Sequence, residues 1–464
     1  LKYRDEEASQ GRPDRMYGYL PLPDLGSNRN INVSCTSEGC DANTFTGIAF
    51  DANNIGPTVV GRFPWRTLGT GPLRDGHGEC LWLIVSSLHS RIQGLNPVLP
   101  PMNWDTLGQL DIVTANGTNA LASALTVHDR PVAIIFSPGP PLDLQDRSVS
   151  TTDTSDVTQC GGNYDAANYL DPKTASALGG ITNYLAGTNN ASGVTGDSDT
   201  SNDPDDVQKK NLSLQGAVFK SGANYLPSGC AGADCELLAN DKGLAITSDI
   251  LFGALRKSSY FRTDINSMLD SMVSCLRDEI AAGGSLSPYG NIAGADNNSC
   301  YGSGVNPQGY YPHYKEMIFV AAPGTVTVAV DGGTGQACAG ALVFAGQRDT
   351  TTLRCPSAPG ISANVQKRSS SAERIDKCNY LEGENLTSFT GSGTTFSGQS
   401  QFARISSTQP SHQDIVRCIP SGASFTSVES VALTTGGYSQ LSAYYPATRT
   451  LTLGALGVNT GVDL

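Results

Sequence analysis

At 464 residues the chain is long enough for two or three hydrophobic cores, and only 16% of its residues are charged, against a usual share of about 25%. Uncharged polar residues and glycine must therefore cover much of the surface, as is common in proteins outside cells. The net charge of −13 excludes the basic footprint that phosphate binding needs, so we expect no nucleic-acid partner.

The first element that the sequence predicts is a helix over Leu1–Gln10 (LKYRDEEASQ), ended by Gly11 and Pro13. Apolar strands are expected over Leu81–Val85 and Pro131–Phe136. From Ser148 to about Gln215 the composition shifts to Thr, Ser, Asp, Asn and Gly, which indicates a long polar surface insertion. These features divide the first half into residues 1–15, 16–147 and 148–215.

The second half begins with the strongest helix pattern of the chain, over Thr263–Ile280, where apolar residues recur on one face and Thr263 can cap the start. Strand patterns follow at Met317–Ala322, Val326–Val330 and Ala341–Ala345, and the tail Ser424–Leu464 alternates like a half-exposed sheet. We therefore expect a helical segment with disulfide loops over 216–310 and a β-rich region over 311–464, giving an α+β fold.

Twelve cysteines beside only five histidines predict disulfides rather than zinc sites, because no Cys-x-x-Cys motif is present. Pairing does not follow from a sequence, but the pairs that we favour are Cys35–Cys40, Cys230–Cys235 and Cys378–Cys418. An oxidising compartment follows. The chain begins at Leu1 with no signal-peptide pattern, so we expect that a segment preceding Leu1 directed its export. No stretch of 18 apolar residues occurs.

Catalytic motifs are missing from the sequence. There is no Gly-x-Ser-x-Gly elbow, paired-histidine motif, phosphate-binding loop or dinucleotide fingerprint. His77 in an Asp-Gly-His-Gly turn and Ser137 before Pro138 are better explained as turn and strand-end residues than as catalytic ones. We therefore expect a protein that assembles or binds, not an enzyme, with no organic cofactor.

One acidic run, Gly196 to Asp206, has the oxygen ligands that calcium prefers. Its candidate ligands are Asp197, Asp199, Asp203 and Asp205. The spacing does not match an EF-hand, and such runs are usually solvated acidic loops, so both interpretations stay open.

The segment Gly61–Ser87 (GRFPWRTLGTGPLRDGHGECLWLIVSS) predicts a turn followed by a central strand. It also resembles the minor pilins and pseudopilins of bacterial type IV pilus and type II secretion systems. That family has an "LPCPD"-like run, then "G-x-LPW-x-TLGL", then "D-x-x-G-x-x-L-x-Y-x-V-S". The counterparts are Tyr19–Asp24, Gly61–Gly69 and Asp75–Ser86, with further similar runs at Pro131–Gly139, Ala337–Arg348, Asn379–Leu386 and Asp414–Pro420. Leu22 stands where the family has a cysteine.

The resemblance implies a structural subunit of a type IV-like filament, either a pilus or a secretion pseudopilus. Residues 1–15 would then be the distal end of a stem helix packed on an antiparallel sheet, and the membrane-anchoring part would precede Leu1. The implied partners are copies of the chain or other pilin-like subunits, together with host or surface ligands, in an extracellular filament or the periplasm. The alternatives are a secreted adhesin or lectin-like module and a secreted hydrolase.

Overall fold

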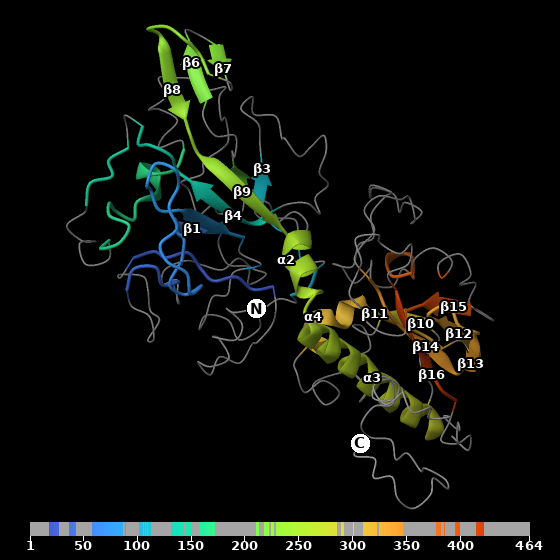
Figure 1. Ribbon diagram of the computed structural model, residues 1–464. Helices are drawn as coiled ribbons and strands as arrows, with labels where there is room; N and C mark the ends of the chain where they lie inside the picture. The colour runs from blue at the N-terminus through green and yellow to red at the C-terminus, as the bar shows by residue number, and fades with distance from the viewer. Residues whose placement is uncertain are drawn as a thin grey trace, which may run out of the picture.

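The computed structural model describes part of the chain. The described residues are 18–26, 37–42, 58–86, 131–142, 145–149, 157–171, 229–284, 289–291, 310–322, 324–346, 377–381, 395–399 and 414–421, with short stretches around 89, 102–112, 210–226, 300 and 385. The predicted helix Leu1–Gln10, the acidic run with Asp197, Asp199, Asp203 and Asp205, and the tail Ser424–Leu464 lie outside these residues. What the structure describes is an α+β fold with mainly antiparallel sheets (Figure 1).

The first lobe contains a four-stranded antiparallel sheet in the order β1-β2-β4-β9. Its strands are β1 (Val59–Arg62), β2 (Trp82–Val85), β4 (Pro131–Ser137) and β9 (Lys242–Thr247). One face is covered over its two central strands, where Trp82, Ile84 and Phe136 pack under Tyr169 and Leu170. Those last two residues belong to the predicted polar insertion, so the part of it over 157–171 contributes to this core. It includes the short helix η3 (Ala166–Asn168).

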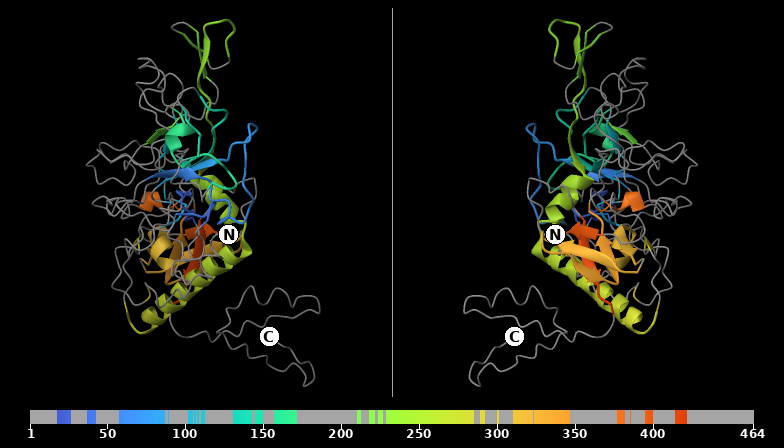
Figure 2. Two further views of the ribbon diagram at one scale, coloured as in Figure 1. Left: turned by 90° about the vertical axis from the view of Figure 1, so that its left-hand side faces the viewer. Right: turned by 90° about the vertical axis from the view of Figure 1, so that its right-hand side faces the viewer.

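A three-stranded ribbon projects away from this lobe, and we call it the arm (Figures 1 and 2). It consists of β6 (Val218–Ser221), β7 (Asn224–Leu226) and β8 (Cys235–Ala239), in the order β7-β6-β8. The chain leaves β8 and continues directly into β9, so the arm extends from one end of the edge strand. A separate parallel pair, β3 (Leu110–Ile112) and β5 (Lys210–Leu212), completes this half.

The second lobe is layered. Its central antiparallel sheet has the order β10-β11-β14-β16, with strands β10 (Tyr289–Asn291), β11 (Ile318–Ala321), β14 (Gly340–Phe344) and β16 (Ile415–Ile419). One face packs on a helix and the other on a small sheet in the order β13-β12-β15, formed by β12 (Val326–Val330), β13 (Gln336–Cys338) and β15 (Thr395–Gly398). Because both faces are covered, β11 and β14 are continuous apolar runs, as the sequence predicted.

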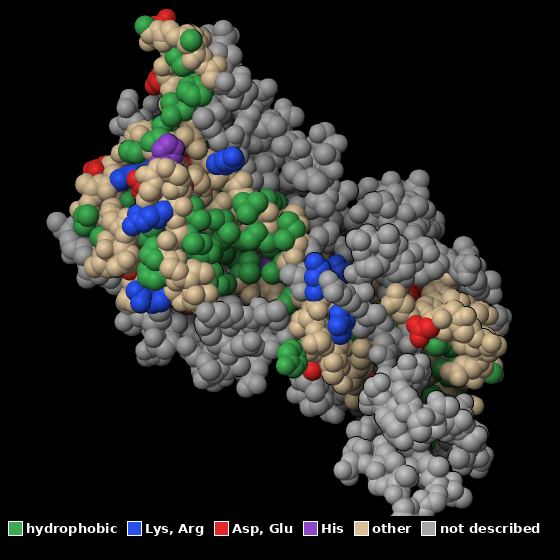
Figure 3. Space-filling model, in the orientation of Figure 1, with side chains coloured by type: hydrophobic (Ala, Val, Ile, Leu, Met, Phe, Trp, Pro, Cys, Tyr) green, Lys and Arg blue, Asp and Glu red, His purple; other side chains and the backbone are tan. Residues whose placement is uncertain are grey.

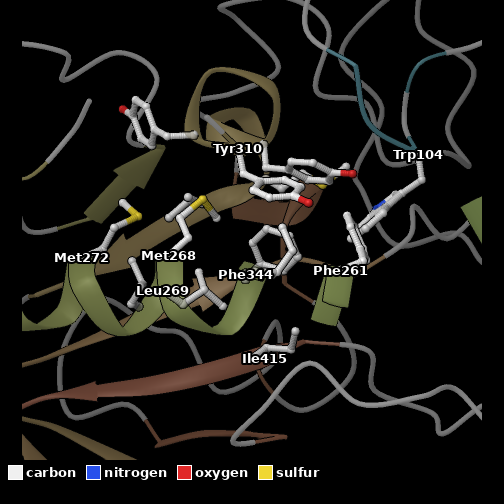
Figure 4. Close-up of a cluster of buried hydrophobic side chains, with 14 of the residues drawn as sticks. Trp104, Phe261, Met268, Leu269, Met272, Tyr310, Phe344 and Ile415 are labelled. Atoms are coloured by element: carbon white, nitrogen blue, oxygen red, sulfur yellow. The ribbon is translucent and has the colours of Figure 1, made fainter. Parts of the chain in front are cut away.

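Helix α3 (Ser259–Ala281) covers the first face of this sheet. The predicted helix is confirmed, and Met268, Leu269 and Met272 are buried on its packed side (Figure 4). It begins four residues before the predicted start, with Ser258 rather than Thr263 at the N-cap, because Phe261 is also buried against the core. The shorter helices of this region are α2 (Ser248–Leu255), α4 (Tyr311–Tyr314), η6 (Lys315–Met317) and η7 (Lys377–Asn379).

The two lobes meet at an aromatic cluster around Trp104, which lies between β2 and β3 along the chain and is 3% exposed. Its ring makes edge contacts with Phe252, Phe261, Tyr314 and Phe344, at centroid distances of 5.3 to 6.4 Å (Figure 4). Tyr310, Tyr311 and Tyr314 are buried in this region and belong to the same hydrophobic core.

Hydrogen bonds join the lobes beside the aromatic cluster. The Met102 amide donates to Nδ1 of His313 (3.0 Å), and the Asn103 side chain donates to the His313 carbonyl (2.7 Å). Burial lowers the pKa of His313 to about 4, so its ring is neutral at physiological pH and can accept this bond. The junction therefore combines apolar packing with satisfied polar groups.

Four disulfides lie among the described residues: Cys80–Cys160, Cys230–Cys235, Cys275–Cys300 and Cys338–Cys418. The pair Cys230–Cys235 is the one that we expected. The expected Cys378–Cys418 pair is wrong, since Cys418 bonds to Cys338. The cause is strand pairing, because Cys418 on β16 lies opposite Ala341 on β14, three residues after Cys338 at the end of β13. Cys378 and Cys40 are also disulfide-bonded, while Cys35 lies outside the described residues.

These bonds place the protein in an oxidising environment, extracellular or periplasmic. Within the described part of the chain, no helix combines the length and apolar character that crossing a membrane requires.

Candidate assembly surface

The second face of the β1-β2-β4-β9 sheet is apolar but only half covered. Across one row of the sheet, exposure rises from Leu83 (5%) through the half-buried Ile135 to Leu244 (66%). A parallel row ends at the half-buried Ile246. A space-filling view shows hydrophobic side chains gathered between β1 and α2 (Figure 3). We call Ile135, Leu244 and Ile246 the open face.

The covered half of this face lies under the first described residues of the chain. Leu20 packs against Leu83 and Val85, and its amide donates to the His89 carbonyl (2.7 Å). A Cβ placed on Gly61 would lie 2.7 Å from the Asp24 carbonyl oxygen, so only glycine allows this close crossing. The N-terminal part of the chain therefore enters the structure directly over this face of the sheet.

A buried ionic cluster fixes that crossing segment. The Arg62 guanidinium, at the end of β1, contacts the Glu38 carboxylate at 3.6 Å, and both side chains are at most 3% exposed. Arg62 also donates to the Asn163 carbonyl (2.8 Å) and stacks over the rings of Tyr164 and Tyr169. A single cation thus connects the sheet to two segments that are distant in sequence.

Carboxylates complete the cluster. Glu38 accepts hydrogen bonds from the Gln159 and Cys160 amides (2.6 and 2.7 Å). Asp24 accepts from the Gly39 amide (2.7 Å) and the Tyr164 hydroxyl (3.0 Å). Because buried charges need both a counterion and hydrogen bonds, this cluster holds the 18–26, 37–42 and 157–171 segments in one arrangement.

The turn that carries Asp75 and His77 has a structural role. The Asp75 carboxylate accepts from the His77 and Glu79 amides and, at the end of β4, from the Ser137 hydroxyl (3.1 Å) and the Gly139 amide (3.0 Å). Burial acts to raise the Asp75 pKa, but the hydrogen bonds outweigh it and hold the pKa below its usual value. In a Ser-His-Asp triad the imidazole bridges serine and carboxylate, whereas here Ser137 bonds to Asp75 directly.

The base of the arm is fixed by two buried carboxyl groups. Asp171 Oδ2 accepts from the Asn240 and Asp241 amides (2.6 and 2.9 Å), and Asp241 Oδ2 accepts from the Asp171 amide (2.7 Å). This exchange connects residue 171 to the link between β8 and β9. Burial raises the pKa of Asp171 to about 6, although the amide donors act against that shift.

We expect this carboxyl to make stability fall as the pH rises from about 4 to 6. The pKa of Asp171 is higher in the folded state than in the unfolded state, so the protonated carboxyl stabilises the fold. This stabilisation is complete below the pKa of the unfolded state, and it is lost as the pH rises through the pKa of the folded state. Urea unfolding at pH 4.5 and pH 7 checks this. Asp171→Asn, which keeps an acceptor oxygen for both amides, should remove that part of the pH dependence. Asp75→Asn is the control and should shift the dependence in the opposite direction, because the Asp75 pKa is lowered.

No group of three or more His, Cys, Asp or Glu that could bind a metal ion occurs among the described residues, and the four candidate calcium ligands lie outside them. The open face, the arm and the ionic cluster carry no linear motif, so no sequence pattern predicted them beyond the apolar strands β2 and β4. Comparisons of this chain with protein-family models, characterised proteins and solved structures find no match.

Proposed function

We propose that the chain is the outer part of a subunit of a type IV-like filament, either a pilus or a secretion pseudopilus. The observation that carries the proposal is the open face of an antiparallel sheet, whose neighbouring half is covered by Leu20 from the N-terminal part of the chain. A helix formed by residues 1–15, and continuing upstream, would cover Ile135, Leu244 and Ile246 and bury their apolar area. Burial of this kind contributes about 25 cal/mol per Å2.

Three further features support this function. The run Gly61–Ser87 resembles pilin-like subunits, and in the structure it supplies β2 and the Asp75 turn. Disulfides and a surface poor in charge suit an exposed position outside the cell. The projecting arm, closed near its tip by Cys230–Cys235, offers a contact site for surfaces or partner subunits. Contact through the arm is also what the adhesin alternative would use.

Substitution on the open face tests this proposal in bacteria that encode the protein. Leu244→Asp should lower the amount of the subunit recovered in sheared filaments by at least about tenfold, because a carboxylate opposes helix packing there. The side chain is 66% exposed, so stability of the isolated chain should change by less than about 0.5 kcal/mol. Immunoblotting of the filament and cell fractions provides the measurement.

The matched control is Leu73→Asp, since Leu73 is also an exposed leucine (41%) of the same lobe but lies between β1 and β2, outside the strands of the sheet. It should leave filament recovery unchanged. Equal recovery of wild type and Leu244→Asp, or absence of the wild-type chain from every filament fraction, would contradict the proposal.

A further inference from the structure

The edge strand β9 has one side on which its backbone pairs with no described strand. The sheet order ends at β9, which pairs with β4 alone among the described strands. Its six residues, Lys242 to Thr247, include Leu244 at 66% exposure and are flanked by the arm at one end and by α2 at the other. An edge with unpaired backbone groups is a template for pairing with another strand.

The hydrogen-bond pattern shows which backbone groups face outward. Ser86 donates to the Val132 carbonyl (2.9 Å), so Val85 and Ala133 form a pair that is not directly hydrogen-bonded. Strict alternation then directs the amide and carbonyl of Ala133 toward β9, where they meet Ile246. It follows that Leu244 and Ile246 bond inward, whereas Gly243 and Ala245 present both backbone groups to the outer side.

We propose that two copies of the chain pair antiparallel through β9, about a two-fold axis at Leu244. In this register Gly243 lies opposite Ala245 of the second copy. The outward-facing amides and carbonyls of these residues form four hydrogen bonds, and the groups that bond to β4 are not involved. Leu244 lies directly opposite Leu244 of the second copy, where side chains of an antiparallel pair approach most closely. The most exposed apolar residue of the strand is thereby buried.

Charges on either side of β9 agree with this arrangement. Glu236 on β8 is exposed and lies eight residues before Leu244, or about 26 Å along an extended chain. Lys257, just after α2, is exposed. It lies about 23 Å beyond Leu244 along the chain, if the three residues after Leu244 are extended and the following ones are helical. The antiparallel arrangement brings the acidic arm of each copy toward the basic end of α2 of the other, and Figure 3 shows Lys and Arg side chains there.

These contacts distinguish a second copy from other occupants. Both the register and the charges are self-complementary, as a two-fold interface requires. Two six-residue strands alone bury less than the roughly 1,200 Å2 of a stable interface, so the arm-to-α2 contacts must supply the remainder. Ile250 on α2 is 59% exposed and adds apolar area close to the end of β9. The inference does not depend on the filament role.

Sedimentation velocity of the full 464-residue chain tests the pairing. We expect a monomer–dimer equilibrium with a dissociation constant between about 1 and 100 μM. Ala245→Pro should raise that constant by about tenfold or more, because it removes two of the four hydrogen bonds and no bond to β4. The control Ala245→Ser keeps the amide and should dimerise like the wild type. Filament recovery of Ala245→Pro should stay normal, which separates this test from that of the open face.

A charge reversal gives a second measurement that does not rely on proline being tolerated. Glu236→Lys and Lys257→Glu should each weaken the dimer by about fivefold, and the two together should restore it. A chain that stays monomeric up to about 500 μM, well above the expected range, would overturn the proposal. So would a dimer that both Ala245→Pro and the charge reversals leave unchanged, which would locate the interface elsewhere.

Discussion

Arg62→Met is expected to lower the free energy of unfolding by about 3–5 kcal/mol, because it leaves the Glu38 carboxylate buried without its cation. Methionine retains most of the apolar length of arginine, so the loss reports on charge rather than on volume. The hydrogen bond to Asn163 and the stacking on Tyr164 and Tyr169 are lost at the same time. Urea unfolding with the disulfides intact, followed by tryptophan fluorescence, measures the change.

Arg66→Met is the matched control. Arg66 lies four residues further along the chain, is exposed, and donates through Nε to the Glu38 carbonyl (3.0 Å) while stacking on Trp65. Its replacement should cost less than about 1 kcal/mol, since exposed charged contacts are weak. A second test is Glu38→Gln with Arg62→Met. If the double variant is more stable than Arg62→Met alone, the cost arises from the uncompensated carboxylate. Equal losses for the two arginine variants would contradict this account.

The elements that the sequence predicted are those whose buried sides show as apolar patterns in their own local sequence. Strands β2, β4, β11, β12 and β14 lie within about one residue of their expected positions because most of their side chains are buried, so each is an apolar run in the sequence. The packed face of α3 was predicted for the same reason, since its period is local. The start of that helix was missed because Phe261 packs on residues distant in sequence, and such a contact cannot be predicted from the local periodicity.

Features that depend on pairing between distant segments were not predictable in this way. Arg62 contacts residues more than 90 positions away, and Cys338 bonds to Cys418 across 80 residues. In both cases each partner is a single polar or sulfur-containing residue whose sequence neighbours form no recognisable motif. The open face was equally hidden, because exposure of Leu244 follows from its place on the edge strand rather than from its type. Short strands such as β13 and β15 form only beside β12, which supplies their partner.

Trp104→Ala is expected to cost about 3–5 kcal/mol and also to separate the unfolding of the two lobes. The indole fills the centre of the junction, touching Phe252 beside β9 and Phe344 on the central sheet of the second lobe. Its removal leaves a cavity that the remaining rings cannot fill without moving either α2 or β14. Because the indole contacts rings on both sides of the junction, the weakened junction should convert one thermal transition into two.

Differential scanning calorimetry of the disulfide-intact chain distinguishes a uniform loss of stability from this uncoupling. Trp104→Phe keeps an aromatic edge toward Tyr314 and should retain one transition with a smaller loss of about 1–2 kcal/mol. The control Trp65→Ala removes a tryptophan that lies at the border of the first lobe and packs against Gly39. It should lower the stability of that lobe without splitting the transition. A single, equally shifted transition for Trp104→Ala and Trp65→Ala would show that the junction does not couple the lobes.

If the junction does couple them, contacts with the second lobe determine the orientation of α2, and with it the direction of β9. Mutations at Trp104 should then also weaken any assembly that uses the open face or the β9 edge.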